Sequence, residues 1–272
     1  MPTKKKPLTP KQGAEKKPPK LDISKKRIEE IIQGVYDGTI GPNDIPEDLY
    51  LAIGEYLTNA LYEGYGMTMA DAEGSDLELI KQLRDNVYHF SAAKSYVEMK
   101  EFSSLLVDDD GKVLSFKEFR DLALQKYDVY NVSYLETEYS TAIGQAYSAQ
   151  KWNDIEEKKE VLPILEYKAI SDPCDICAPL DGLTAPVDDS IWASIAPLNH
   201  FNCKCILVQH DEEEKLTPDE KKQDMFVNAV GLMQPMFRSN PGQDGMIFNE
   251  SHPYFEEAAK EKLDLKVPKK DK

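Results

Sequence analysis

The residues best suited to chemistry are the four cysteines, which all lie between positions 174 and 205. Cys174 and Cys177 form a C-x-x-C pair, Cys203 and Cys205 form a C-x-C pair, and His200 stands three residues before the second pair. Thiolate sulfur and imidazole nitrogen are preferred ligands of protein-bound zinc. Two separated clusters of such donors are typical of one shared metal ion, and we predict a zinc site here.

The spacing within each pair suits chelation of one ion. Two intervening residues let both thiols of a C-x-x-C turn face the same point, and His200 with Cys203 has the same spacing. Residues i and i+2 of an extended strand project to one side, so Cys203 and Cys205 can also converge. A structural zinc takes four ligands, so one of the five donors is spare. The sequence leaves open which of Cys203 and Cys205 completes the set.

A site filled by protein ligands has no position for a bound water, which favours a structural role over catalysis. The segment 178–199 between the pairs is rich in Pro, Asp and Ser, and Leu183, Ile191 and Trp192 are its main apolar residues. We therefore expect the metal to order a poorly packed loop. The alternatives are buried thiols, a disulfide-tied loop, or a redox-active C-x-x-C pair.

Motifs of enzymatic catalysis are missing from the sequence. It has no nucleophile elbow, no phosphate-binding glycine loop and no H-E-x-x-H pair. We therefore predict that the chain is not an enzyme.

Two short strands are predicted to hold the donors. Residues 165–170 alternate and carry β-formers, and they precede the first cysteine pair, whereas residues 205–209 follow the second pair. The metal site would then lie where two strands of a small sheet meet.

The N-terminal two-thirds of the chain has helical periodicity. Asp22 or Ser24 can cap a first helix, Pro46 starts a second, residues 76–100 form a third, and Ser115 caps a further helical stretch with a break at 131–133. The fold class predicted is α+β, mostly helical with a small zinc-clasped β region. The segments expected are a basic arm (1–20), a helical region (21–160), the Cys/His region with short strands (161–212) and a C-terminal extension (213–272).

The charge of the chain limits its partners. The formal net charge is −16, whereas a general nucleic-acid binder needs clustered lysine and arginine against the phosphates. Residues 1–20 are the exception, with seven lysines and one glutamate. Their proline-rich composition predicts a disordered arm that could make a weak contact with DNA or an acidic partner surface.

No apolar run approaches the roughly 20 residues that a membrane-spanning helix needs, so no membrane span is predicted. The basic N-terminus is not followed by a hydrophobic segment, so we also expect no secretory signal. The chain is expected to be made in the cytoplasm, where reduced thiols favour metal ligation over disulfides.

The cysteine window resembles the C-terminal motif of phage minor head proteins of the Mu F and SPP1 gp7 type. The stretch Y-K-A-I-S-D-P-C-D-I-C-A-P-L-D-G, then a Trp, then P-L-N-H-F-N-C-K-C-I-L-V carries the resemblance. The matching residues are Asp172, Cys174, Cys177, Leu180, Asp181, Gly182, Trp192, Pro197, His200, Cys203 and Cys205. Weaker similarity extends over about residues 45–255. Two positions depart from the family pattern. Lys204 stands where Arg is usual, and a lone Pro197 precedes Asn199 and His200 where many members carry Pro-Pro or Pro-Arg. Neither departure removes a donor.

The resemblance implies a role in head morphogenesis, with the portal protein and capsid or scaffold proteins as partners and effects on DNA packaging or ejection. It also implies a location in the virion after assembly in the cytoplasm of the bacterial host. Two other classes compete with this prediction. One is a phage-associated effector or toxin enzyme, which the missing catalytic motifs disfavour. The other is a zinc-stabilised DNA-binding adaptor, which the acidic balance disfavours.

Overall fold

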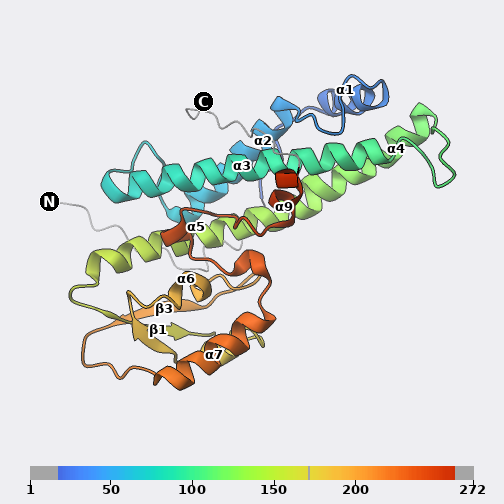
Figure 1. Ribbon diagram of the computed structural model, residues 1–272. Coiled ribbons are helices and arrows are strands. Elements are labelled where there is room, and N and C mark those ends of the chain that lie inside the picture. The colour runs from blue at the N-terminus through green and yellow to red at the C-terminus, as the bar shows by residue number, and fades with distance from the viewer. Residues whose placement is uncertain (1–17, 171, 261–272) are drawn as a thin grey trace. The chain divides into compact units, whose positions relative to one another are not determined.

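The computed structural model describes residues 18–170 and 172–260, which form two compact units (Figure 1). Of the described residues, 60–83 and 140–249 form one unit, here called the sheet unit, and 18–59, 84–139 and 250–260 form the other, the helical unit. Residues 1–17 of the predicted basic arm lie outside the described residues, as do residues 261–272. The four segments expected along the sequence stay a prediction.

The fold is α+β, as predicted: helices dominate and a small antiparallel sheet follows them. The helices are α1 (Lys25–Tyr36), α2 (Glu47–Tyr65), α3 (Gly74–Ser104), α4 (Phe116–Asp128), the π-helix η1 (Val129–Tyr134), α5 (Leu135–Lys158), the 3₁₀ turns η2 (Ala178–Leu180) and η3 (Pro235–Phe237), α6 (Trp192–Ile195), α7 (Asp219–Leu232), α8 (Pro241–Asp244) and α9 (Pro253–Lys260). The strands are β1 (Ile164–Lys168), β2 (Thr184–Pro186) and β3 (Ile206–His210). No helix in the described ranges is long and apolar enough to cross a membrane.

The sheet has the order β2-β1-β3, with β1 antiparallel to both neighbours. Leu165 in β1 lies opposite Ala185 in β2 and Gln209 in β3, which fixes the register. The strands predicted at 165–170 and 205–209 are confirmed as β1 and β3. Strand β2 was not predicted, because a three-residue strand that ends in proline has no alternating pattern to recognise.

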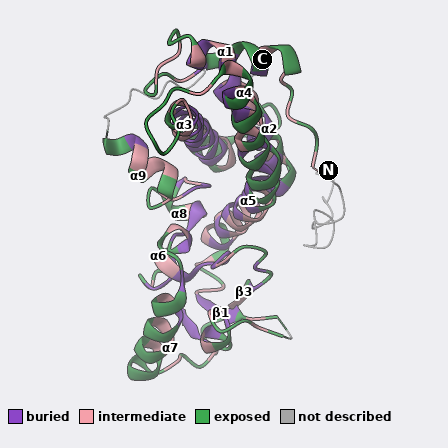
Figure 2. Cartoon of the chain, turned by 90° about the vertical axis from the view of Figure 1, so that its right-hand side faces the viewer, coloured by how far each residue is buried: buried purple, intermediate pink, exposed green. Residues whose placement is uncertain are grey.

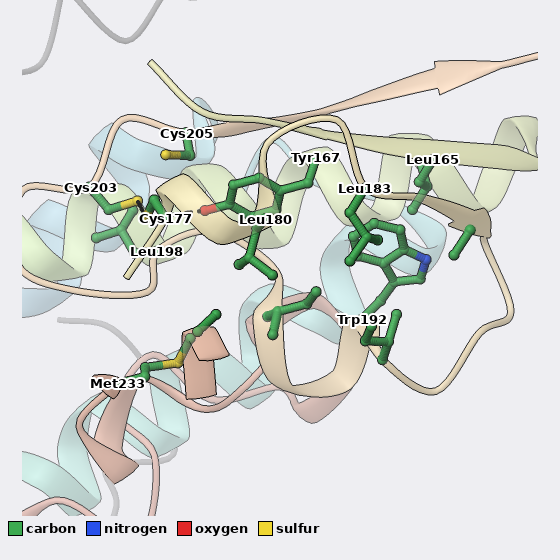
Figure 3. Packing of buried hydrophobic residues seen from close by; sticks show 14 of the residues in the cluster. Leu165, Tyr167, Cys177, Leu180, Leu183, Trp192, Leu198, Cys203, Cys205 and Met233 are labelled. Carbon is green, nitrogen blue, oxygen red and sulfur yellow. Dashed lines mark hydrogen bonds between the residues drawn. The ribbon is translucent and has the colours of Figure 1, made fainter. Parts of the chain in front are cut away.

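The segment 178–199 is packed, so the expectation of a poorly packed loop is wrong. Trp192 is fully buried, and its indole Nε1 donates to the Pro186 carbonyl at 2.8 Å. Figure 3 shows Leu180, Leu183 and Trp192 gathered with Leu165 of β1 in one apolar core. Burial of these side chains stabilises the segment without a metal ion, because large apolar side chains each contribute about 1.5–3 kcal/mol when buried.

The helical unit follows its sequence signals closely. Ser24 caps α1 by accepting from the backbone N–H of Arg27, and Ser115 with Glu118 forms a reciprocal capping box at the start of α4. The break expected at 131–133 is wrong, since α4 passes through the π-helix η1 into α5 without leaving helical structure. A π-helix adds one residue to a turn, which disturbs the apolar periodicity in the same way as a break.

One close backbone approach organises the helices of the sheet unit. A Cβ on Gly64 of α2 would lie 2.1 Å from the backbone oxygen of Ile143 in α5. Only glycine therefore fits at this position. Gly231 on α7 is a contrasting case, because a Cβ there would meet nothing within 4 Å. Figure 2 shows that much of the surface of α7 is exposed.

This contrast gives a paired prediction on stability. Gly64→Ala should lower the free energy of unfolding by about 3 kcal/mol, since an added methyl forces the backbones apart. Gly231→Ala should raise it by about 0.5–1 kcal/mol, because alanine loses less entropy in a helix and meets no obstacle. Urea unfolding of both variants measures the two effects. Equal changes in the two variants would contradict the close approach of α2 and α5.

Candidate metal centre

The five predicted donors come from two stretches that the sheet brings together. Cys174 and Cys177 lie in the turn that follows β1, and Cys177 immediately precedes η2. Cys205 directly precedes β3, and Cys203 lies two residues earlier. Because Lys168 at the end of β1 pairs with Ile206 at the start of β3, the two stretches begin side by side.

The donor atoms form two overlapping groups of three. Cys174, Cys177 and His200 make one group, and Cys177, Cys203 and Cys205 make the other. Within each group the sulfur and nitrogen atoms all lie within 4.8 Å of one another. Cys177 belongs to both groups and is fully buried, so it is the centre of the donor set. Either group could hold a metal ion.

The distance between sulfurs fits tetrahedral coordination. The Sγ atoms of Cys177 and Cys203 are 3.8 Å apart. Two thiolates on a tetrahedral zinc, with Zn–S bonds of about 2.3 Å, have their sulfurs about 3.8 Å apart. All four cysteines are free thiols. Their geometry is therefore compatible with a metal ion and does not form a disulfide.

Tyr167 and Asn199 extend a hydrogen-bond chain into the sulfur cluster. Asn199 Nδ2 donates to the Tyr167 hydroxyl at 3.0 Å, and this hydroxyl donates to Cys177 Sγ at 3.3 Å. Asn199 Nδ2 also donates to the Ile195 carbonyl at 3.2 Å, which fixes the orientation of the amide. Figure 3 shows the Tyr167 hydroxyl pointing toward Cys177. Burial raises the pKa of Tyr167, so the hydroxyl keeps its proton and acts as a donor.

The first cysteine of each pair has a lowered pKa. Hydrogen bonds from the thiols of Cys177 and Cys205, followed by backbone N–H groups including that of Asn199, lower the pKa of Cys203. Partial burial opposes ionisation of Cys174, yet backbone N–H groups of Cys177 and Ile176 bring its pKa below the ordinary value. Backbone donors aimed at sulfur stabilise the deprotonated form that binds metal ions.

Cys177 has the opposite tendency. Its hydrogen bond to Cys203 is the largest cause that raises its pKa, and burial adds to the effect. Without a metal ion, Cys177 is therefore a thiol that donates to the Cys203 thiolate. A metal cation would replace this shared proton as the positive charge between the sulfurs.

The orientation of His200 leaves one ring nitrogen for a ligand. Nδ1 lies 2.8 Å from the carbonyl oxygen of Phe201. A carbonyl oxygen only accepts hydrogen bonds, so Nδ1 carries the hydrogen and Nε2 keeps its lone pair in the neutral ring. This arrangement is the usual one for metal-binding histidines, whose second nitrogen donates to a carbonyl or carboxylate.

Sequence reasoning selected all five donors but missed the two side chains that support them. Tyr167 is an ordinary inward-facing aromatic residue of a strand, and Asn199 resembles a loop residue. Their relation to Cys177 arises only when β1 and the residues after α6 pack together. The available signal was the place of Tyr167 on the inward face of the alternating run that forms β1. This signal identifies a core residue but not the residue that it contacts.

A comparison with protein families identifies a relationship over more than half of the chain. The model of the family described as phage Mu protein F like protein matches residues 57–208. The match includes all five donors, Tyr167 and Asn199. No curated protein and no solved structure matches the chain.

The different environments of the thiols predict their reactivity. In metal-free folded protein, iodoacetamide should modify Cys174 first, because it is exposed and its pKa is lowered. Cys203 is also thiolate-like but buried, so it should react at least about tenfold more slowly and serve as an internal control for access. Peptide mapping by mass spectrometry measures both rates. Faster labelling of Cys177 or Cys203 than of Cys174 would contradict the arrangement.

Proposed function

Because the chain belongs to the phage Mu protein F-like family, a family of phage head morphogenesis proteins, we propose that it is a minor head protein with a structural zinc site. The matched region carries this proposal. It begins in α2, runs through the whole cysteine window and ends within β3. The family is one of structural head proteins, and the proposal assigns no catalytic residue to the chain.

Zinc is the metal whose chemistry fits these donors best. Three or four thiolates and one imidazole are soft to borderline ligands, which suit zinc and disfavour magnesium or calcium. The donors lie mostly in the apolar core of the sheet unit, with Cys177, Cys203 and Cys205 buried. A site whose four positions are filled by protein ligands leaves none for water, which fits a structural ion.

The proposed ligand set is Cys174, Cys177, His200 and Cys203. Cys177 Sγ is 3.8 Å from Cys203 Sγ, the separation expected for two ligands of one ion. The backbone N–H of Cys205 is one of the groups that lower the pKa of Cys203. Cys205 would then remain a thiol beside the ion, and its backbone would support Cys203. This assignment is our proposal for the choice that the sequence left open.

A metal ion in this position would connect the turn after β1 with the segment before β3. Structural zinc binding in small domains contributes on the order of 10 kcal/mol, but here the core around Trp192 already packs the intervening segment. The ion is therefore proposed to stabilise the sheet unit and to fix the ends of its strands, without being required for collapse of the whole unit.

The partners proposed are the portal protein and the capsid or scaffold proteins, and the final location is the virion. Assembly would take place in the cytoplasm of the bacterial host. These proposals rest on the family relationship. A role in DNA packaging or ejection rests on the family resemblance. A DNA contact by the lysine-rich arm rests on sequence composition, since residues 1–17 lie outside the described part.

The zinc proposal is tested by a matched pair of cysteine variants. Protein purified without chelator under anaerobic conditions should contain about one zinc ion per chain. Cys203→Ser should lose most of the zinc and lower the melting temperature by several degrees, whereas Cys205→Ser should retain it. Elemental analysis and thermal unfolding measure the two effects.

Each outcome of this experiment bears on a different statement. Absence of zinc from the wild type would overturn the metal site itself. Zinc retained by Cys203→Ser and lost by Cys205→Ser would reverse the choice of fourth ligand. Loss in both variants would show that the ion uses all three buried thiols.

The morphogenesis proposal is tested by assembly. When the chain is co-expressed with the portal, scaffold and capsid genes of its phage, it should co-purify with procapsids through a density gradient. Cys177→Ser, which removes the thiol common to both donor groups, should reduce incorporation, and Gly231→Ala should leave it unchanged. If the wild-type chain stays out of the particles, the proposed role is wrong.

A further inference from the structure

A cluster of buried ionisable side chains lies in the helical unit, away from the cysteines in sequence. Lys94 of α3 is fully buried, and its Nζ lies 2.9 Å from Glu138 Oε1 at the start of α5. The ammonium also lies 5.2–5.9 Å from the ring centroids of Tyr130, Tyr134 and Tyr254. Lys94 is thus neutralised by Glu138 and surrounded by aromatic faces.

Glu98 lies one helical turn beyond Lys94 and is also fully buried. Its Oε1 accepts from Asn131 Nδ2 of η1 at 2.8 Å. Among the described residues, Glu98 Oε2 and Asn131 Oδ1 have no hydrogen-bond partner. Both unpartnered atoms belong to the same pair of side chains.

The balance of donors and acceptors identifies the charge state of this pair. If Glu98 were ionised, the pair would contain two buried oxygens that only accept and receive nothing, which is costly. If Oε2 carries a proton, the pair gains a donor that the Asn131 oxygen can accept. The single ammonium of Lys94 is already paired with Glu138, so a second buried carboxylate would have no compensating cation in the cluster.

We propose that Glu98 holds a proton in the folded chain and releases it when η1 and α9 open, which makes this cluster a pH-sensitive switch. The two elements are the ones whose side chains close it. Asn131 and Tyr130 belong to η1, and Tyr254 at the start of α9 is hydrogen-bonded to Glu138. The mechanism requires no ligand and does not depend on the proposed zinc site or head function.

The surroundings of Glu98 support a neutral carboxyl. Burial is the largest cause that raises its pKa to about 8, while the hydrogen bond from Asn131 and the charge of Lys94 act in the opposite direction. The titratable and charged groups of the elements around it are Lys94 and Glu101 on α3, Tyr127 on α4, Tyr130 and Tyr134 on η1, Glu138 on α5, and Tyr254, with His252 just before α9. Burial lowers the pKa of His252 to about 4, so it adds no positive charge near neutral pH.

The sign of the pH effect follows from the direction of the shift. The folded pKa of Glu98 is above its ordinary value of 4.5, so between 4.5 and about 8 the closed state holds a proton that the open state has released. Opening therefore becomes more favourable as pH rises through this range and levels off above it. One proton changes the opening equilibrium about tenfold per pH unit.

Hydrogen–deuterium exchange on the full chain tests the switch. After correction for intrinsic exchange rates, protection of residues 129–134 and 250–260 should fall as pH rises from about 6 and level off near the folded pKa. Glu98→Gln keeps the shape but removes the ionisation, and it should flatten the dependence by about tenfold per pH unit. Burial also raises the pKa of Glu138, which adds its own pH dependence to the protection. The contribution of Glu98 is therefore measured as the difference between the variant and the wild type.

The matched control is Glu30→Gln, in the same unit but on α1, with a side chain 47% exposed and paired with Lys26. This variant should keep the pH dependence of the wild type. A second variant, Asn131→Ala, removes both the donor to Glu98 Oε1 and the oxygen that can accept the Glu98 proton, so its protection should level off at a different pH from that of the wild type.

Two results would overturn the proposal. One is an equal pH dependence in Glu98→Gln and the wild type. The other is an Asn131→Ala variant whose protection levels off at the same pH as that of the wild type. If Glu98→Gln does not fold, the Asn131→Ala comparison decides the question by itself.

Discussion

Antiparallel pairing of β1 with β3 is the constraint on which the cysteine site depends. The pairing places the turn after β1 beside the residues before β3, and it therefore brings together donors that are about thirty residues apart in sequence. Tyr167 in β1 then reaches Cys177 from within the sheet. The site is thus specified by strand register first and by the identity of the donors second, because a slip of one residue would turn the strand side chains to the other face.

Local chemistry made much of this architecture predictable from the sequence. Capping residues indicated α1 and α4, alternation with β-formers indicated β1, and the spacing of the cysteines indicated the candidate donors. Each of these signals resides within a few consecutive residues, so it can be read without knowing the fold. The family relationship was also recognisable from the cysteine window, because its spacing is more specific than its composition.

The features that escaped prediction depend on contacts between distant residues. The segment 178–199 looks polar by composition, but its few apolar side chains converge with those of β1 and α7 in one core. The support that Asn199 and Tyr167 give to Cys177 is likewise a tertiary contact. In the helical unit, η1 shifted the helical periodicity by a residue, and the pairing of Glu98 with Asn131 follows from that turn.

The placement of the two tryptophans makes tryptophan fluorescence specific to one of the two units. The chain has two tryptophans, and Trp152 and Trp192 both lie buried in the core of the sheet unit. The helical unit holds tyrosines but no tryptophan, so intrinsic tryptophan emission follows one unit only. Far-ultraviolet circular dichroism follows helices throughout the chain. Coincident transitions by these two probes would mean that the units unfold together, and separate transitions would resolve each unit's stability without any label.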